Sequence, residues 1–193
     1  MLTVAHILFS LVLVVSGSQE TLRDAVRKNG STGALVLIEY APLELSDLAK
    51  GAHLIIRGRI VGEKPRLSKD EQSVVTDVTV QVLDVFRAGK AVLVPGSNLI
   101  VVKPGGTIIL EGHEASTSEP DFPPFQLGEE YFLFLADRVG GLQVNGGGQG
   151  AFRVEGAEVR QASTAHAAWQ EKNGRVDVAA FLAQLTDSIQ LRK

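Results

Sequence analysis

The sequence predicts a mainly β fold, in which a small closed antiparallel barrel is combined with a short helix before its first strand and a packed helix at the C-terminal end. Segment 52–63, AHLIIRGRIVGE, alternates apolar and polar residues, as a strand with one buried face does. Gly58 interrupts this strand, and such a glycine often marks a sharp bend or the close approach of another backbone. A second alternating strand at 74–86 follows a polar connection, so the two are expected to form a hairpin.

The composition indicates a folded, turn-rich domain. The chain has 193 residues, of which 45% are hydrophobic, and it contains 20 glycines. It has no cysteine, which excludes disulfides as well as cysteine-ligated zinc and iron–sulfur sites. A formal charge of -3 does not favour nucleic acid as a partner, because non-specific binding to phosphates depends on an excess of positive charge.

Residues 1–18 are predicted to be a signal peptide. An apolar run at 7–15 precedes the small residues Ser16, Gly17 and Ser18, which form the expected cleavage site. The segment before the apolar run has no lysine or arginine, so an uncleaved N-terminal membrane anchor is the alternative. We therefore expect a secreted or periplasmic protein that contacts a membrane only if this segment is retained.

The next segment, 19–42, is expected to be an N-terminal extension. A short helix is predicted at 21–28, where Thr21 is placed to cap its start and Gly30 to end it. A strand rich in branched residues follows at 34–40.

A second short helix, at 43–50, is predicted to lead into the strand at 52–63. Segment 131–136, YFLFLA, is apolar on both faces and must be covered on both. The glycine-rich segment 146–150 is interpreted as a flexible hairpin turn, since the lysine and the following helix of a phosphate-binding loop are absent. Further strands are expected at 99–103, 107–111, 142–145 and 151–155.

The C-terminal helix is the expected cover for one outer face of the sheet. Asp177 is placed to cap it, and it follows a polar connector that starts at residue 161. Its apolar side chains recur at helical spacing and form one stripe: Val178, Phe181, Leu182, Leu185 and Ile189.

The order of these elements matches a five-stranded OB-type barrel at 43–160. The successive segments AHLIIRGRIV, VVTDVTVQVLDVFRAG, LIVVKPGG, FQLGEEYFLFL and GGGQGAFRV resemble uncharacterised secreted bacterial proteins with OB-like barrels, which are distantly similar to netrin/TIMP-like domains. The resemblance covers 43–154. TIMP-like inhibitors chelate metal through an N-terminal cysteine that this chain lacks, so their inhibitory residues have no counterpart here.

The densest group of candidate metal ligands or acid–base residues is the predicted loop from Glu111 to Asp121. It contains His113 and Glu114, and such a set suits zinc or calcium, so a metal-dependent hydrolase is one alternative function. However, a zinc HExxH motif needs a second histidine at position 117, which is a threonine. A solvated acidic loop is the competing interpretation, and we assign no metal ligand and no cofactor.

Arg57 and Arg59 lie on the polar side of the first long strand. Their guanidinium groups suit phosphates or carboxylates, so binding of an oligonucleotide or oligosaccharide on the barrel face is a further alternative. The outward positions of this sheet offer no aromatic residue for stacking. Pairing of either arginine with Asp77 across the hairpin is the structural interpretation.

Phe122 is a candidate for a hydrophobic recognition tip, whereas Phe125 is expected to pack into one end of the barrel. No nucleophile with a neighbouring base is evident from spacing. The sequence therefore favours a secreted non-enzymatic binding or interaction module of unknown ligand, whose partner is another protein or a cell-envelope component rather than nucleic acid. The candidate binding residues are His113, Glu114, Asp121, Phe122, Arg57 and Arg59.

Overall fold

The computed structural model describes residues 20–36, 40–89, 93–120, 122, 124–163 and 168–190, which form a mainly β protein with a C-terminal helix, as predicted. The strands in these ranges are β1 (Thr32–Leu35), β2 (Leu54–Leu67), β3 (Val74–Arg87), β4 (Asn98–Pro104), β5 (Gly106–Leu110), β6 (His113–Ser118), β7 (Glu130–Arg138), β8 (Gly141–Val144), β9 (Ala151–Glu155), β10 (Glu158–Gln161) and β11 (Val176–Asp177). The helices are α1 (Leu22–Asn29), α2 (Leu45–Gly51), α3 (Ala168–Asn173), α4 (Val178–Gln190) and the 3-10 turn η1 (Gly147–Gly150).

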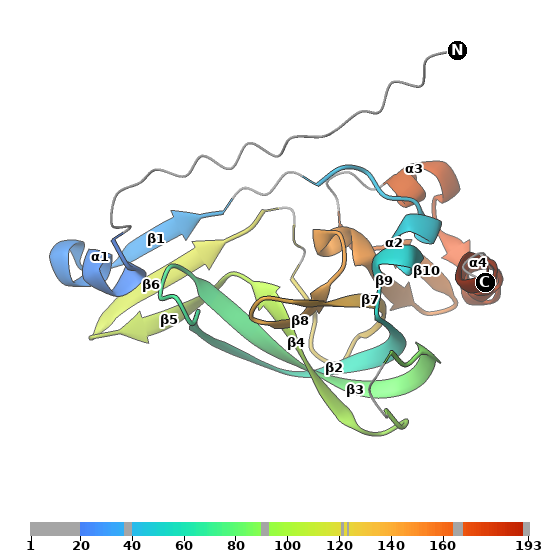
Figure 1. Cartoon of the computed structure of the whole chain (residues 1–193), viewed down its shortest axis with the longest axis horizontal. Helices are drawn as coiled ribbons and strands as arrows, with labels where there is room; N and C mark the ends of the chain where they lie inside the picture. Colours follow the sequence, from blue (N-terminus) through green and yellow to red (C-terminus); the bar gives the residue numbers. More distant parts are fainter. Residues whose placement is uncertain are drawn as a thin grey trace, which may run out of the picture.

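The predicted hairpin of β2 and β3 is the longest feature of the molecule and runs between its two ends (Figure 1). Its register shifts at Arg57 and Gly58, which confirms the predicted irregularity. A β-carbon at Gly58 would press on the side chain of Val80 and come within 3.0 Å of the carbonyl oxygen of Gln81. The glycine is therefore needed where β3 approaches β2 closely at the register shift.

The predicted closed five-stranded barrel is wrong, because the main sheet has eight strands and is open. Its order is β11-β10-β9-β7-β2-β3-β4, with β8 paired to β7. Strands β4 and β8 lie beside each other without forming a ladder. Strand β8 has four residues, and β4 ends at Pro104, which has no N–H to donate, so neither edge favours closure.

A second, three-stranded sheet lies at the opposite end of the hairpin from helices α2, α3 and α4 (Figure 1). Strand β6 pairs antiparallel with β5 and parallel with β1. The prediction of a loop between residues 111 and 121 is therefore wrong for most of its length. Ala115 and Thr117 of β6 are buried, and the alternation of small residues at these positions lets the strand lie flat against the hairpin.

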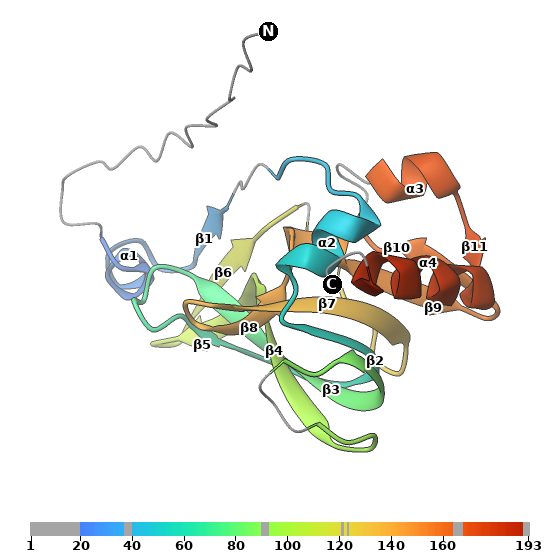
Figure 2. The same ribbon diagram turned by 45° about the vertical axis from the view of Figure 1, so that its right-hand side comes forward.

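Helices α2 and α4 pack side by side over the outer face of the main sheet (Figure 2), as predicted for the strand that is apolar on both faces. Phe132 and Phe134 of β7 and Ile55 of β2 point into this layer and are fully buried. The Asp177 carboxylate accepts a hydrogen bond from the Ala179 N–H at 2.7 Å and caps α4.

Two short helices at the N-terminal side also match their predictions. The Thr21 hydroxyl accepts a hydrogen bond from the Asp24 N–H at 3.1 Å at the start of α1, and Gly30, with φ of +77°, ends the helix. Strand β1 starts two residues before the predicted strand at 34–40, of which residues 37–39 lie outside the described ranges. The connector predicted from residue 161 contains α3 and β11. Trp169 of α3 is buried in the core between the helices and the main sheet.

The predicted signal peptide also lies outside the described residues. Among the residues that the structure describes, no helix combines the length and the apolar character that a membrane span requires.

Candidate functional site

The described side chains of the acidic segment 111–121, which suggested a metal site, do not point toward one place. His113 and Glu114 are exposed neighbours on β6 and point to opposite faces of the small sheet. Glu111 binds Arg27 at 2.7 Å, and the hydrogen bonds from Arg27 lower the pKa of Glu111. Asp121 lies outside the described residues. Within the described part of the chain, no three histidine, aspartate or glutamate side chains gather as a metal-binding group.

The candidate arginines Arg57 and Arg59 share one carboxylate. Each approaches an oxygen of Glu130 within 2.6 Å, and Arg57 also lies 5.9 Å from the ring centre of Phe132. Burial raises the pKa of Glu130, but hydrogen bonds from Arg59 and Arg57 outweigh it, so this pKa lies below its ordinary value.

The predicted pairing of either arginine with Asp77 is wrong. The register of the hairpin places Asp77 opposite Lys64, and its carboxylate accepts a hydrogen bond from Arg66 at 2.8 Å. Asp77 on β3 therefore lies opposite a part of β2 that is several residues away from Arg57 and Arg59.

Phe122 is buried, with 8% of its surface exposed, and stacks edge to face against Phe125 at 5.6 Å. Phe125 packs in turn on Tyr131 at 5.0 Å, within the main core, so its predicted packing role is confirmed. Phe122 also borders a cavity, which distinguishes it from the other candidate residues that the structure describes.

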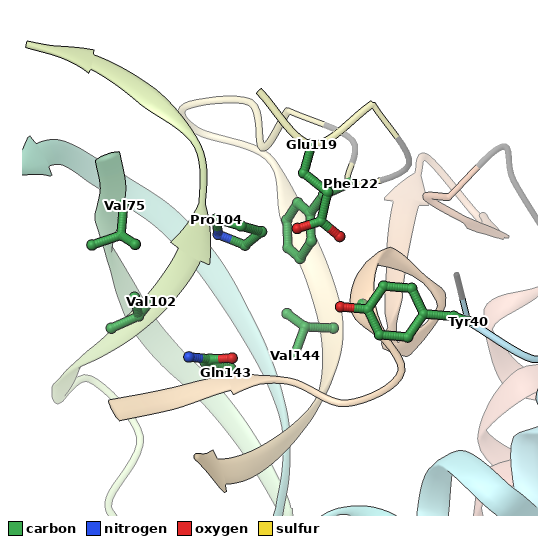
Figure 3. Close-up of a pocket in the computed structure, with 9 residues that line it drawn as sticks. Tyr40, Val75, Val102, Pro104, Glu119, Phe122, Gln143 and Val144 are labelled. Carbon is green, nitrogen blue, oxygen red and sulfur yellow. The ribbon is translucent and has the colours of Figure 1, made fainter. Parts of the chain in front are cut away.

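This cavity, the seam pocket, has a volume of about 90 Å³ and lies where β4, the end of β6 and η1 meet. Figure 3 shows the Glu119 carboxylate, the Phe122 ring and the Tyr40 hydroxyl turned toward one space, with Val144 on its side. The carboxylate belongs to a buried residue, with 6% of its surface exposed. The pocket is lined by Tyr40, Val75, Val102, Pro104, Glu119, Phe122, Gln143, Val144 and Gly147.

Tyr40 is held over the seam pocket by η1. The buried Gln149 side chain accepts a hydrogen bond from the Leu43 N–H at 2.9 Å and donates one to the Ala41 carbonyl oxygen at 3.1 Å. The interpretation of 146–150 as a flexible turn is therefore wrong: its glycines allow close packing, and its glutamine holds the segment that carries Tyr40.

A second cavity, the tip pocket, adjoins the seam pocket, since Val75, Val102 and Gln143 line both. It has a volume of about 290 Å³ and lies between the tips of the β2–β3 and β7–β8 hairpins. Together the two cavities form what we call the seam groove. The remaining residues of the tip pocket are Arg66, Ser68, Lys69, Asp70, Ser73, Val139 and Gly140.

The lining of the seam groove suits binding. Its floor is formed by valines, and polar groups lie at both ends, as in most ligand sites. Ser68 and Ser73 line the tip pocket, where the Ser68 hydroxyl donates a hydrogen bond to the Asp70 carboxylate at 2.6 Å, and no histidine is among the described lining residues.

Among the groove residues, sequence reasoning named Phe122 as a candidate and included Glu119 only as a member of the acidic segment 111–121. Tyr40, Glu119 and Gln143 come from three segments that the topology brings together, and no local pattern connects them. The one available signal was Gln149, an isolated polar side chain within a run of glycines.

Searches of protein-family models and of curated proteins found no match to this chain.

Proposed function

We propose that the protein is a non-enzymatic binding module that holds an extended peptide segment of another protein in the seam groove. The observation that carries this proposal is the gap between β4 and β8, where two neighbouring strands without a ladder leave two adjoining cavities with an apolar floor. An extended chain places alternate side chains on one face and can fill adjoining cavities with them. Peptide and groove would be held mainly by apolar burial against Val75 and Val102.

The groove also has an edge that suits main-chain hydrogen bonds. The N–H of Gly105 donates to the Val74 carbonyl oxygen at 3.0 Å, and the β3–β4 register is regular, so alternate residues of β4 bond to β3. The intervening residues, including Val102, direct their peptide groups away from β3. Strand β4 thus offers Val102 to a bound chain in the same way that sheet edges bind peptides elsewhere.

The proposal also covers where the protein acts and which fold class its strands belong to. The apolar run at 7–15 supports export, so we place the partner outside the cytoplasm or in the cell envelope. We also propose that β2, β3, β4, β8 and β7 are an opened OB-like arrangement, in which the missing β4–β8 ladder has become the binding groove.

The experiment is a titration of ¹⁵N-labelled protein, followed by amide chemical shifts, with three probes used separately: the peptide Ac-Ser-Val-Thr-Val-Lys-NH₂, chitotetraose and hexathymidylate. The peptide is expected to shift the amides of Val102, Gln143 and Val144, with a dissociation constant of about 0.1 to 1 mM because few groups are buried. Shifts confined to Arg57 and Arg59 with either of the other probes would replace the proposal with saccharide or nucleic-acid binding.

The hydrolase alternative is tested with the same preparation. Chromogenic esters, phosphates and glycosides are expected to remain intact, with and without added zinc. Turnover that disappears in His113→Ala would overturn the non-enzymatic proposal.

A further inference from the structure

A third cavity, the mouth pocket, lies where β2 begins, β3 ends and β4 begins, beside the β7–β8 hairpin. It shares none of its described lining residues with the seam groove. Its volume of about 430 Å³ falls within the roughly 300 to 1,000 Å³ that small-molecule sites occupy. The mouth pocket is therefore large enough to hold a ligand of its own.

The apolar walls of the mouth pocket belong to the main core. Leu54 is buried in this core, whereas Leu99 of β4 and Leu142 of β8 pack against it and remain partly exposed. The last two residues come from the strands that form no ladder with each other, so the core is incompletely covered at this end of the gap. A molecule with an apolar body would be stabilised by removing these leucine surfaces from water.

His53 gives the mouth pocket a defined hydrogen-bond donor. Its Nδ1 accepts a hydrogen bond from the Asp137 N–H at 3.1 Å, so the neutral ring carries its proton on Nε2. Nε2 is then a donor, which suits a ligand with an acceptor such as a carbonyl oxygen. The Asp137 carboxylate lies 3.6 Å from Nδ1 and disfavours a negatively charged ligand at the same place.

From this geometry we propose that the mouth pocket binds a small neutral molecule that has an apolar body and one hydrogen-bond acceptor, as a medium-chain ketone or ester has. The apolar body would contact Leu54, Leu99 and Leu142, and the acceptor would receive a hydrogen bond from His53. This binding goes beyond the peptide binding proposed for the seam groove and does not depend on it.

The test is a titration of protein labelled with ¹³C in its leucine methyl groups, with 2-octanone, octanoate and octylammonium used separately. 2-Octanone is expected to shift the methyl signals of Leu54, Leu99 and Leu142, with a dissociation constant of about 0.1 to 1 mM. Octanoate is expected to bind more weakly because of Asp137, and octylammonium because it has no acceptor for His53. Absence of these shifts with 2-octanone, or binding of either charged compound at least as tight, would overturn the proposal.

His53→Leu keeps an apolar side chain at this position and removes the donor. It is expected to weaken 2-octanone binding about three- to tenfold, which corresponds to the loss of one hydrogen bond. The His53 side chain is 60% exposed, so the variant is expected to fold as the unaltered protein does. The matched control is His113→Leu, at an exposed position on β6 in the small sheet, which is expected to leave the affinity unchanged. Equal affinities of the two variants for 2-octanone would overturn the assignment of His53 as the donor and of a neutral acceptor as its ligand.

Discussion

The ring of Tyr40 lies directly against the α-carbon of Gly147, so that a β-carbon at position 147 would come within 2.6 Å of Tyr40 Cε2. Gly147 also has φ of +61°, a conformation that favours glycine. This contact sets the position of one aromatic wall of the seam pocket, because a side chain added at position 147 would overlap the Tyr40 ring.

Gly147→Ala is therefore expected to displace Tyr40 and to lower the free energy of unfolding by about 2 to 4 kcal/mol, since steric overlap adds to backbone strain. Urea denaturation measures the change, and a peptide titration measures the accompanying loss of seam binding. The matched control is Gly112→Ala, where φ is +85° but no atom lies within 4 Å of the added carbon. Equal destabilisation of the two variants would show that the Tyr40 contact has no energetic role.

Gln149→Leu is expected to lower the free energy of unfolding by about 2 to 4 kcal/mol, because the Leu43 N–H and the Ala41 carbonyl oxygen both lose their partner. The segment that contains Ala41 and Leu43 is expected to become more mobile than the change in the global free energy of unfolding alone would indicate. Hydrogen exchange at the Leu43 amide measures this directly, and unchanged protection there would contradict the proposed role of Gln149 in holding Tyr40.

The cluster of Glu130 with Arg57 and Arg59 predicts a pH-dependent contribution to stability. The folded-state pKa of Glu130 is lowered from its ordinary value of 4.5, so the stabilisation is complete above that value and is lost as the pH falls through the folded-state pKa. Glu130→Gln is expected to lower the free energy of unfolding by about 1 to 2 kcal/mol at neutral pH, since both arginines are partly solvated.

Urea midpoints of the unaltered protein and Glu130→Gln, measured from about pH 7 to about pH 3, provide the comparison. The two curves are expected to converge at the acidic end. A difference that stays constant over this range would show that the carboxylate charge is not what stabilises the cluster.

Gly58→Ala is expected to lower the free energy of unfolding by about 2 to 4 kcal/mol, because the new methyl group would press on Val80 and on the Gln81 carbonyl oxygen. Gly62→Ala in the same strand is the control, since its nearest neighbours, atoms of Thr79, are 3.7 Å away. Thermal unfolding of both variants measures the difference. A larger loss for Gly62→Ala would contradict the close approach of β3 to β2 at Gly58.

The local elements were predictable because their signals are local. Alternation in 52–63 and 74–86 and the doubly apolar strand at 131–136 each reflect burial that the folded protein bears out. The cap at Asp177 reflects a hydrogen bond at the end of its own helix. Closure of the barrel was not predictable, because it depends on whether β4 and β8 pair, and neither strand carries a pattern that distinguishes an edge from a paired strand.

The candidate site was predictable only at Phe122, for a related reason. Strand β6 consists of small and polar residues that resemble a loop, and it becomes a strand because β1 and β5 supply its partners. Glu119 follows β6 directly, and its burial depends on the tertiary fold. Its charge alone predicts an exposed side chain. Tyr40 reaches the same cavity from a segment about 80 residues earlier, through the contacts of Gln149 and Gly147.

The most direct test of this account is to locate a bound peptide by isotope-filtered NOEs between unlabelled Ac-Ser-Val-Thr-Val-Lys-NH₂ and ¹³C-labelled protein. The account predicts NOEs from the valine methyl groups of the peptide to Val75 and Val102. NOEs that instead connect the peptide to the exposed side chains of Leu35 and Ile109, on the far sheet, would contradict it.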